Sequence, residues 1–78
     1  MSEFGVGQRV REDPVGAALR AATAAIIALR TVNRRAARRL STTFDQIAQQ
    51  HTSGLLDDTE TIRALARIAS DAGREQHA

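Results

Sequence analysis

A long stretch of the chain contains no residue that breaks a helix. Pro14 is the only proline, and after Gly16 no glycine follows until Gly54. Alanine, arginine, leucine and glutamine are frequent in this stretch, and all four favour helices. Asp13 supplies an N-cap before a proline at the first helical position, and Gly54 suits a left-handed C-terminal cap. The sequence therefore predicts one long helix over about residues 14–52.

Inside this predicted helix, apolar residues recur at alternating spacings of three and four, which is typical of a coiled coil. The strongest part of the pattern, which we call the seam, consists of Leu19, Ala22, Ile26, Leu29, Asn33, Ala36 and Leu40. We expect the seam to be the interface with a partner. Asn33 has two interpretations: a polar core residue that fixes register and oligomeric state, or the point where the seam ends or faces solvent.

A second helix is predicted over about residues 57–73, because Asp57 and Glu60 have the spacing of a capping box. Folding it back on the first helix gives an all-α helical hairpin, with dimeric packing like that of a coiled coil or bundle. The hydroxyl-rich residues 41–43 lower helix propensity, so a break there that produces three helices stays open. The expected organisation is a flexible N-terminal arm at 1–12, a single helical domain at 13–73 and a polar tail at 74–78.

The size of the chain limits the stability of any core. It has 78 residues, no cysteine and an apolar fraction of 42% in which alanine is the commonest residue. A single core of this size rarely supplies more than ~3–5 kcal/mol. The second helix is too short to cover the half of the seam that contains Ile26 and Leu29, and each large aliphatic side chain left in water forgoes ~1.5–3 kcal/mol. We therefore expect the chain to form a homo-oligomer or to dock on a larger protein assembly.

Membrane and secretory signals are absent from the sequence. The longest apolar run, residues 21–29, is much shorter than the ~20 residues that a bilayer span needs. The chain starts without a charged segment followed by an apolar one, which a secretory leader would have. These features favour a cytoplasmic protein over a secreted or membrane-bound one.

The sharpest local signal is a group of arginines on the predicted long helix. All 11 basic residues of the chain are arginine, and no acidic residue lies between residues 14 and 44. The group consists of Arg30, Arg34, Arg35, Arg38 and Arg39. At helical spacing these side chains form a basic face that suits the phosphates of a nucleic acid, or an acidic patch on a protein partner. The alternative is a solvated face paired with the second helix, in which Asp71 lies opposite Arg39. Glu75 then lies opposite Arg35.

Residues 33–39 resemble part of the basic region of bZIP transcription factors. In that family an Asn and an Ala pair face the bases, while arginines hold the backbone. The resemblance covers seven residues of 78 and departs from the family at Leu40 and Ser41. Gly54 also interrupts the helix where a leucine zipper would follow. We assign no family on this basis.

No motif with catalytic chemistry is present, because the sequence has no nucleophile–base pair, phosphate loop or glycine fingerprint. His51 and His77 are the only histidines and cysteine is absent, so we expect neither a metal nor another cofactor. The sequence thus predicts a non-enzymatic helical protein–protein interaction module that associates through the seam. The alternative is a small dimeric nucleic-acid-binding regulator that uses the arginine group.

Overall fold

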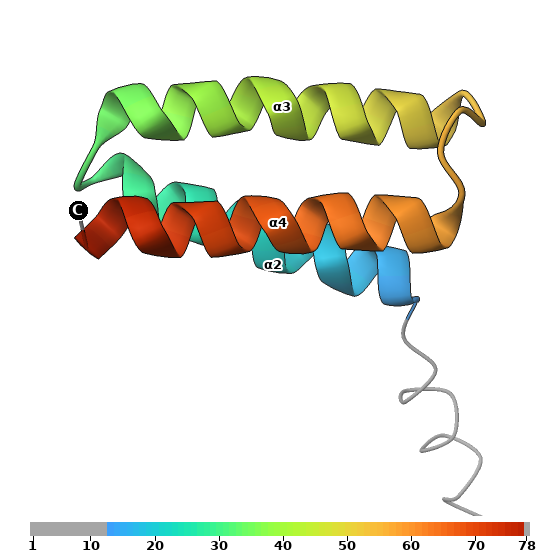
Figure 1. Ribbon diagram of the computed structural model, residues 1–78, viewed down its shortest axis with the longest axis horizontal. Helices are drawn as coiled ribbons and strands as arrows, with labels where there is room; N and C mark the ends of the chain where they lie inside the picture. Colours follow the sequence, from blue (N-terminus) through green and yellow to red (C-terminus); the bar gives the residue numbers. More distant parts are fainter. Residues whose placement is uncertain (1–12, 78) are drawn as a thin grey trace, which may run out of the picture.

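The computed structural model describes residues 13–77, which form three α-helices and no strand (Figure 1). Helix α2 spans Pro14–Arg30, α3 spans Arg34–Thr52 and α4 spans Asp58–His77. The all-α class is confirmed. The expectations for the N-terminal arm at 1–12 and for Ala78 lie outside the described residues.

The three helices form a bundle in which α3 runs antiparallel to both α2 and α4 (Figure 1). Helix α2 lies beside α4 and makes its most extensive contact with it, and both helices also pack on α3. Alanines make this close packing possible, because their side chains let two helix backbones approach. Ala22 of α2, Ala36 and Ala37 of α3 and Ala72 of α4 are all buried.

The predicted long helix is broken at residues 31–33, and the prediction of one continuous helix over 14–52 is wrong there. Asn33 has an extended backbone and is the N-cap of α3, since its Oδ1 accepts the backbone N–H of Ala36 at 3.1 Å. The alternative break at residues 41–43 does not occur, because α3 is continuous there. The hydroxyls of Thr42 and Thr43 instead donate to the carbonyls of Arg38 and Arg39 inside α3, so the local hydrogen bonds are satisfied without a break.

Replacing Asn33 distinguishes a helix cap from a polar seam residue. We expect Asn33→Ala to lower the free energy of unfolding by about 1 kcal/mol, because the N–H of Ala36 loses its acceptor. Asn33→Asp keeps an equally good cap and should stay within about 0.5 kcal/mol of the natural chain. Chemical denaturation followed by circular dichroism measures both. A gain in stability for Asn33→Ala would contradict the cap.

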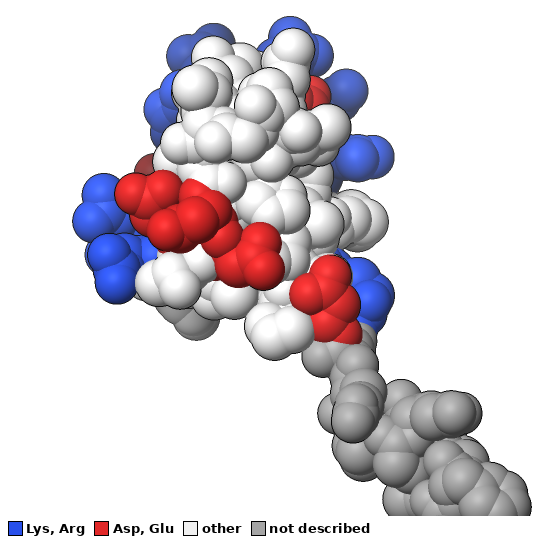
Figure 2. Space-filling view, turned by 90° about the vertical axis from the view of Figure 1, so that its right-hand side faces the viewer, with Lys and Arg blue, Asp and Glu red and all other residues white. Residues whose placement is uncertain are grey.

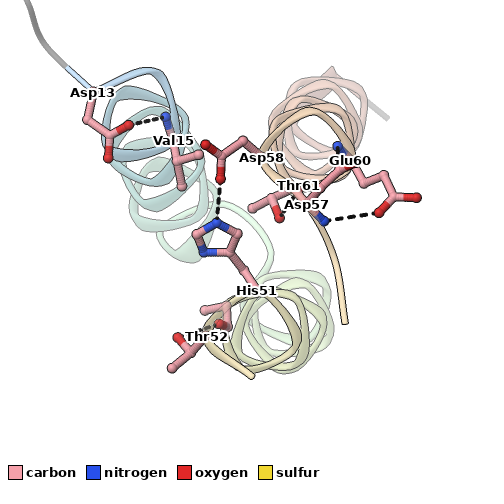
Figure 3. Close-up of polar contacts among 9 residues, drawn as sticks. Asp13, Val15, His51, Thr52, Asp57, Asp58, Glu60 and Thr61 are labelled. Carbon is pink, nitrogen blue, oxygen red and sulfur yellow. Dashed lines mark hydrogen bonds and ion pairs between the residues drawn. The ribbon is translucent and has the colours of Figure 1, made fainter. Parts of the chain in front are cut away.

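Helix α4 begins with the predicted capping box. The backbone N–H of Glu60 donates to Asp57 Oδ1 at 2.7 Å, and the N–H of Asp57 donates to Glu60 Oε1 at 3.1 Å (Figure 3). One polar residue, Thr61, is buried behind this box, and its hydroxyl donates to the carbonyl of Asp57 at 2.8 Å. The helix continues past Gly73 to His77, so the polar tail expected from residue 74 is helical as far as His77.

Two glycines provide a matched pair of substitutions. Gly54, in the turn after α3, has a φ of +84°, which L side chains rarely adopt, and Gly73 lies inside α4 with open space around it. We expect Gly54→Ala to lower the free energy of unfolding by about 1–2 kcal/mol and Gly73→Ala to raise it by about 0.5–1 kcal/mol. Thermal and urea unfolding of the two variants checks the opposite signs. Equal effects at both positions would contradict the left-handed turn.

The core lies where all three helices meet, and it contains most of the seam. Ala22 and Leu29 are completely buried, Ala36 is buried, and Ile26 is 6% exposed. The prediction that this half of the seam stays uncovered is wrong. The turn at residues 31–33 folds α2 back, so α4 covers it with Leu65, Ile68 and Ala72. The remaining seam residues, Leu19, Asn33 and Leu40, are half-buried.

Candidate functional site

The turn between α2 and α3 brings the predicted arginines to one end of the bundle. Arg30 is the last residue of α2, and Arg34 and Arg35 are the first residues of α3. Arg38 and Arg39 follow one helical turn later. All five are exposed, and we call this surface the basic end.

A recess of about 310 Å³ lies within the basic end, between the end of α2 and the first half of α3. It is lined by Arg30, Arg34, Ala37, Arg38 and Ser41. Ala37 is buried, and the other lining residues are three arginines and one serine. The structure therefore gathers three of the five predicted arginines around one hollow. No signal in the sequence pointed to the recess itself, because the recess depends on the turn at residues 31–33.

Most of the basic end has no acidic partner. Arg39 Nη2 lies 3.6 Å from Glu75 Oε2, which makes it the one member of the five with an ion pair in the described part of the chain. Within residues 13–77, no carboxylate lies within ion-pair distance of Arg30, Arg34, Arg35 or Arg38. The arginine group therefore does pair with α4, but the two residues of the pair differ from those expected. Glu75 meets Arg39, and Asp71 pairs with Arg74 on its own helix.

The positions of Arg34 and Arg35 oppose the electrostatics of their own helix. Both lie in the first turn of α3, where no acidic side chain is present. The N-terminal end of a helix carries a partial positive charge, so a cation there costs about 0.3–1 kcal/mol where an anion would stabilise. The helix dipole adds to the positive potential of the arginines. The basic end is thus built at some expense of helix stability.

The opposite end of the bundle carries acidic side chains, which gather over the starts of α2 and α4 (Figure 2). Each of these carboxylates has an intrachain role (Figure 3). Asp13 caps α2 through the N–H of Val15 at 3.2 Å, and Asp57 and Glu60 form the capping box of α4. Asp58 Oδ1 lies 2.8 Å from His51 Nε2. Helix capping and the contact with His51 therefore account for the acidic end, while no comparable contact within residues 13–77 accounts for the four arginines without a partner.

A second surface feature is a groove of about 470 Å³ between α3 and α4. Its walls are largely apolar and include Leu40, Ile47 and Ile68. The large apolar side chains that stay exposed elsewhere in residues 13–77 are separate from one another in the sequence, at Ile27, Val32 and Leu55. The sequence did not indicate the groove, because half of its wall comes from α4.

Metal-binding clusters and membrane-spanning helices are not found in residues 13–77. No three His, Cys, Asp or Glu side chains of this segment come together in a way that would hold a metal ion. None of its three helices combines the length and the hydropathy that crossing a bilayer requires. Comparison of the chain with protein-family models, with curated proteins and with solved structures finds no match.

Proposed function

We propose that this chain is a non-enzymatic nucleic-acid-binding module that holds the phosphate backbone with its basic end. The observation that carries the proposal is the set of four exposed arginines without an acidic partner in the described residues: Arg30, Arg34, Arg35 and Arg38. Arginine is the side chain best suited to phosphate, because its planar guanidinium donates two parallel hydrogen bonds. Each phosphate that it neutralises releases condensed counterions, which drives association.

The composition of this surface favours backbone contact over sequence reading. Phe44 is the only Phe, Tyr or Trp in the described segment, and it is half-buried against the core. The basic end therefore lacks the stacking platforms on which many proteins bind unpaired bases. Contacts to phosphates position a protein without carrying sequence information. We therefore expect affinity that varies little with base sequence.

Direct binding measurements test this function. Fluorescence anisotropy of labelled oligonucleotides about 20 nucleotides long, single-stranded and duplex, is followed at about 50 mM salt as the purified chain is added. We expect saturable binding to at least one of the two forms. Sequences of equal length and different composition should bind with affinities within about threefold of each other. No binding to either form at this salt concentration would refute the proposed function.

Self-association through the groove between α3 and α4 is a second candidate function, and we propose a second copy of the chain as the occupant. The rim of the groove on α4 carries both signs of charge, with Glu60 and Arg67 two helical turns apart. An antiparallel contact between two α4 helices can place Glu60 of each copy against Arg67 of the other, as a two-fold interface requires. In this candidate the dimer interface is the groove between α3 and α4, which the folded chain leaves open, and not the seam, which is largely buried.

Light scattering over a range of concentrations tests self-association. We expect the average mass to rise above that of the monomer as concentration increases. Thr43→Arg places a charged side chain in the groove at an exposed position and should return the mass to that of a monomer. A constant monomer mass for the natural chain would rule this candidate out.

A further inference from the structure

The geometry points to the recess of the basic end as a binding site for a terminal phosphate, the monoester group at the end of a nucleic-acid strand. This inference rests on the proposed function and specifies the group that the recess accepts. Arg30, Arg34 and Arg38 line the recess together with the hydroxyl of Ser41. None of these three arginines has an ion pair within the described residues, so their guanidinium donors are available to a ligand.

Ser41 differs from the two hydroxyl residues that follow it. Thr42 and Thr43 donate their hydroxyls to carbonyls one helical turn back, which is the usual bond of such residues inside a helix. Ser41 makes no such bond in the described structure and lies half-buried at the wall of the recess. Its hydroxyl is therefore free to donate to an oxygen bound in the recess. The recess is thus lined by four side chains that can donate hydrogen bonds.

Charge and shape both favour a monoester over the diester of a continuous strand. A phosphate monoester carries about −1.5 to −2 charges near neutral pH and three acceptor oxygens. A diester carries a single charge and has two substituents that must continue along the surface. Three arginines around one hollow match the greater charge, and a terminal group can enter the recess without bending the strand. Arg35 does not line the recess, so it remains available to contact the strand outside it.

Oligonucleotides that differ only at the 5′ end test this inference. The affinity of the chain is measured for one sequence with a 5′-phosphate and for the same sequence with a 5′-hydroxyl. Because charged hydrogen bonds are involved, we expect the phosphorylated strand to bind about tenfold more tightly. Equal affinities would overturn the binding site for a terminal phosphate while leaving the proposed function intact. Failure of both strands to bind would refute the proposed function itself.

Two matched pairs of variants locate the effect. Arg34→Gln and Arg35→Gln remove the same charge from the same helical turn, and only Arg34 lines the recess. We expect Arg34→Gln to abolish the preference for the 5′-phosphate, and Arg35→Gln to weaken both strands equally. Ser41→Ala should reduce the preference about threefold, while Thr42→Ala should leave it unchanged because that hydroxyl is already bonded. Equal effects within either pair would place the preference outside the recess.

Competition identifies the source of the phosphate. A free mononucleotide and inorganic phosphate are each titrated against the bound 5′-phosphorylated strand. We expect each competitor to displace the strand only at concentrations far above the concentration of the strand, because the strand also contacts Arg35 outside the recess. Displacement by either compound at concentrations as low as that of the strand would show that the recess binds free phosphate compounds, and would overturn the assignment to a strand end.

Discussion

Reversing the charges of Arg34 and Arg38 together is expected to lower the affinity for nucleic acid by at least about a hundredfold. Each substitution removes a phosphate contact and adds a repulsive carboxylate, and about 1.4 kcal/mol at each position is a tenfold loss. Both side chains are exposed and have no partner within residues 13–77, so the fold loses no contact. Glutamate at residue 34 also suits the first turn of α3 better than arginine does. Anisotropy titrations at low salt measure the loss.

The matched control is the pair Arg63→Glu and Arg67→Glu. These residues have the same spacing on α4, are also exposed, and lie on the rim of the other groove. The double variant changes the net charge by the same amount, so we expect it to lower affinity by less than about fivefold through the overall field alone. Circular dichroism and light scattering on both variants monitor fold and oligomeric state. Equal losses for the two double variants would show that binding is not located at the basic end.

Truncating Leu29 is expected to cost about 2–5 kcal/mol in the free energy of unfolding, which is the range for leucine in a packed core. Leu29 is fully buried among the three helices. In a rod with an uncovered seam the same change would cost little. A domain of this size has only a few kcal/mol of stability, so we expect Leu29→Ala to be largely unfolded at room temperature by circular dichroism.

A milder variant and an exposed control keep this prediction measurable. Ile26→Val removes one methylene from a residue that is 6% exposed and should cost about 0.5–1.5 kcal/mol. Leu55→Ala, at a residue that is 73% exposed, should stay within about 0.5 kcal/mol of the natural chain. If Leu29→Ala behaves like Leu55→Ala, α4 does not cover α2 as described.

The helix boundaries that carry local signals could be predicted from the sequence. Asp13 before Pro14 starts α2, and Asp57 with Glu60 starts α4, because each uses side-chain oxygens to satisfy free N–H groups of the first turn. Gly54 has the positive φ expected of a turn after a helix. These features depend on residues close in sequence, so no knowledge of the tertiary fold is needed to find them.

The turn at residues 31–33 could not be placed from the same information. The spacing of three and four runs through it without interruption, because both α2 and α3 turn an apolar face toward the core. Asparagine is a suitable residue type both for a polar seam position and for an N-cap, so the identity of Asn33 does not decide between them. The choice between them is made by tertiary packing. Breaking the helix costs a few backbone hydrogen bonds, but it buries Ile26 and Leu29 against α4.

Membership of the basic end could be predicted, but its geometry could not. The five arginines are close in sequence and stay together whether or not the helix is broken. Their partners depend on the register between α3 and α4, which the turn after Thr52 sets. Glu75 therefore meets Arg39 in place of Arg35, and Arg35 keeps no partner in the described segment. The recess also needs the turn before α3, which brings Arg30 to the wall shared with Ser41.

The most direct test of the central claim is the salt dependence of nucleic-acid binding by the unmodified chain. Four unpaired arginines whose charges displace about four condensed counterions predict that the logarithm of the affinity falls linearly with the logarithm of the salt concentration, with a slope of about −3. Anisotropy titrations between about 50 and 200 mM salt give this slope. A slope near −3 supports phosphate contact by the unpaired arginines of the basic end. Binding that does not change with salt, or no binding at the lowest concentration, would contradict it.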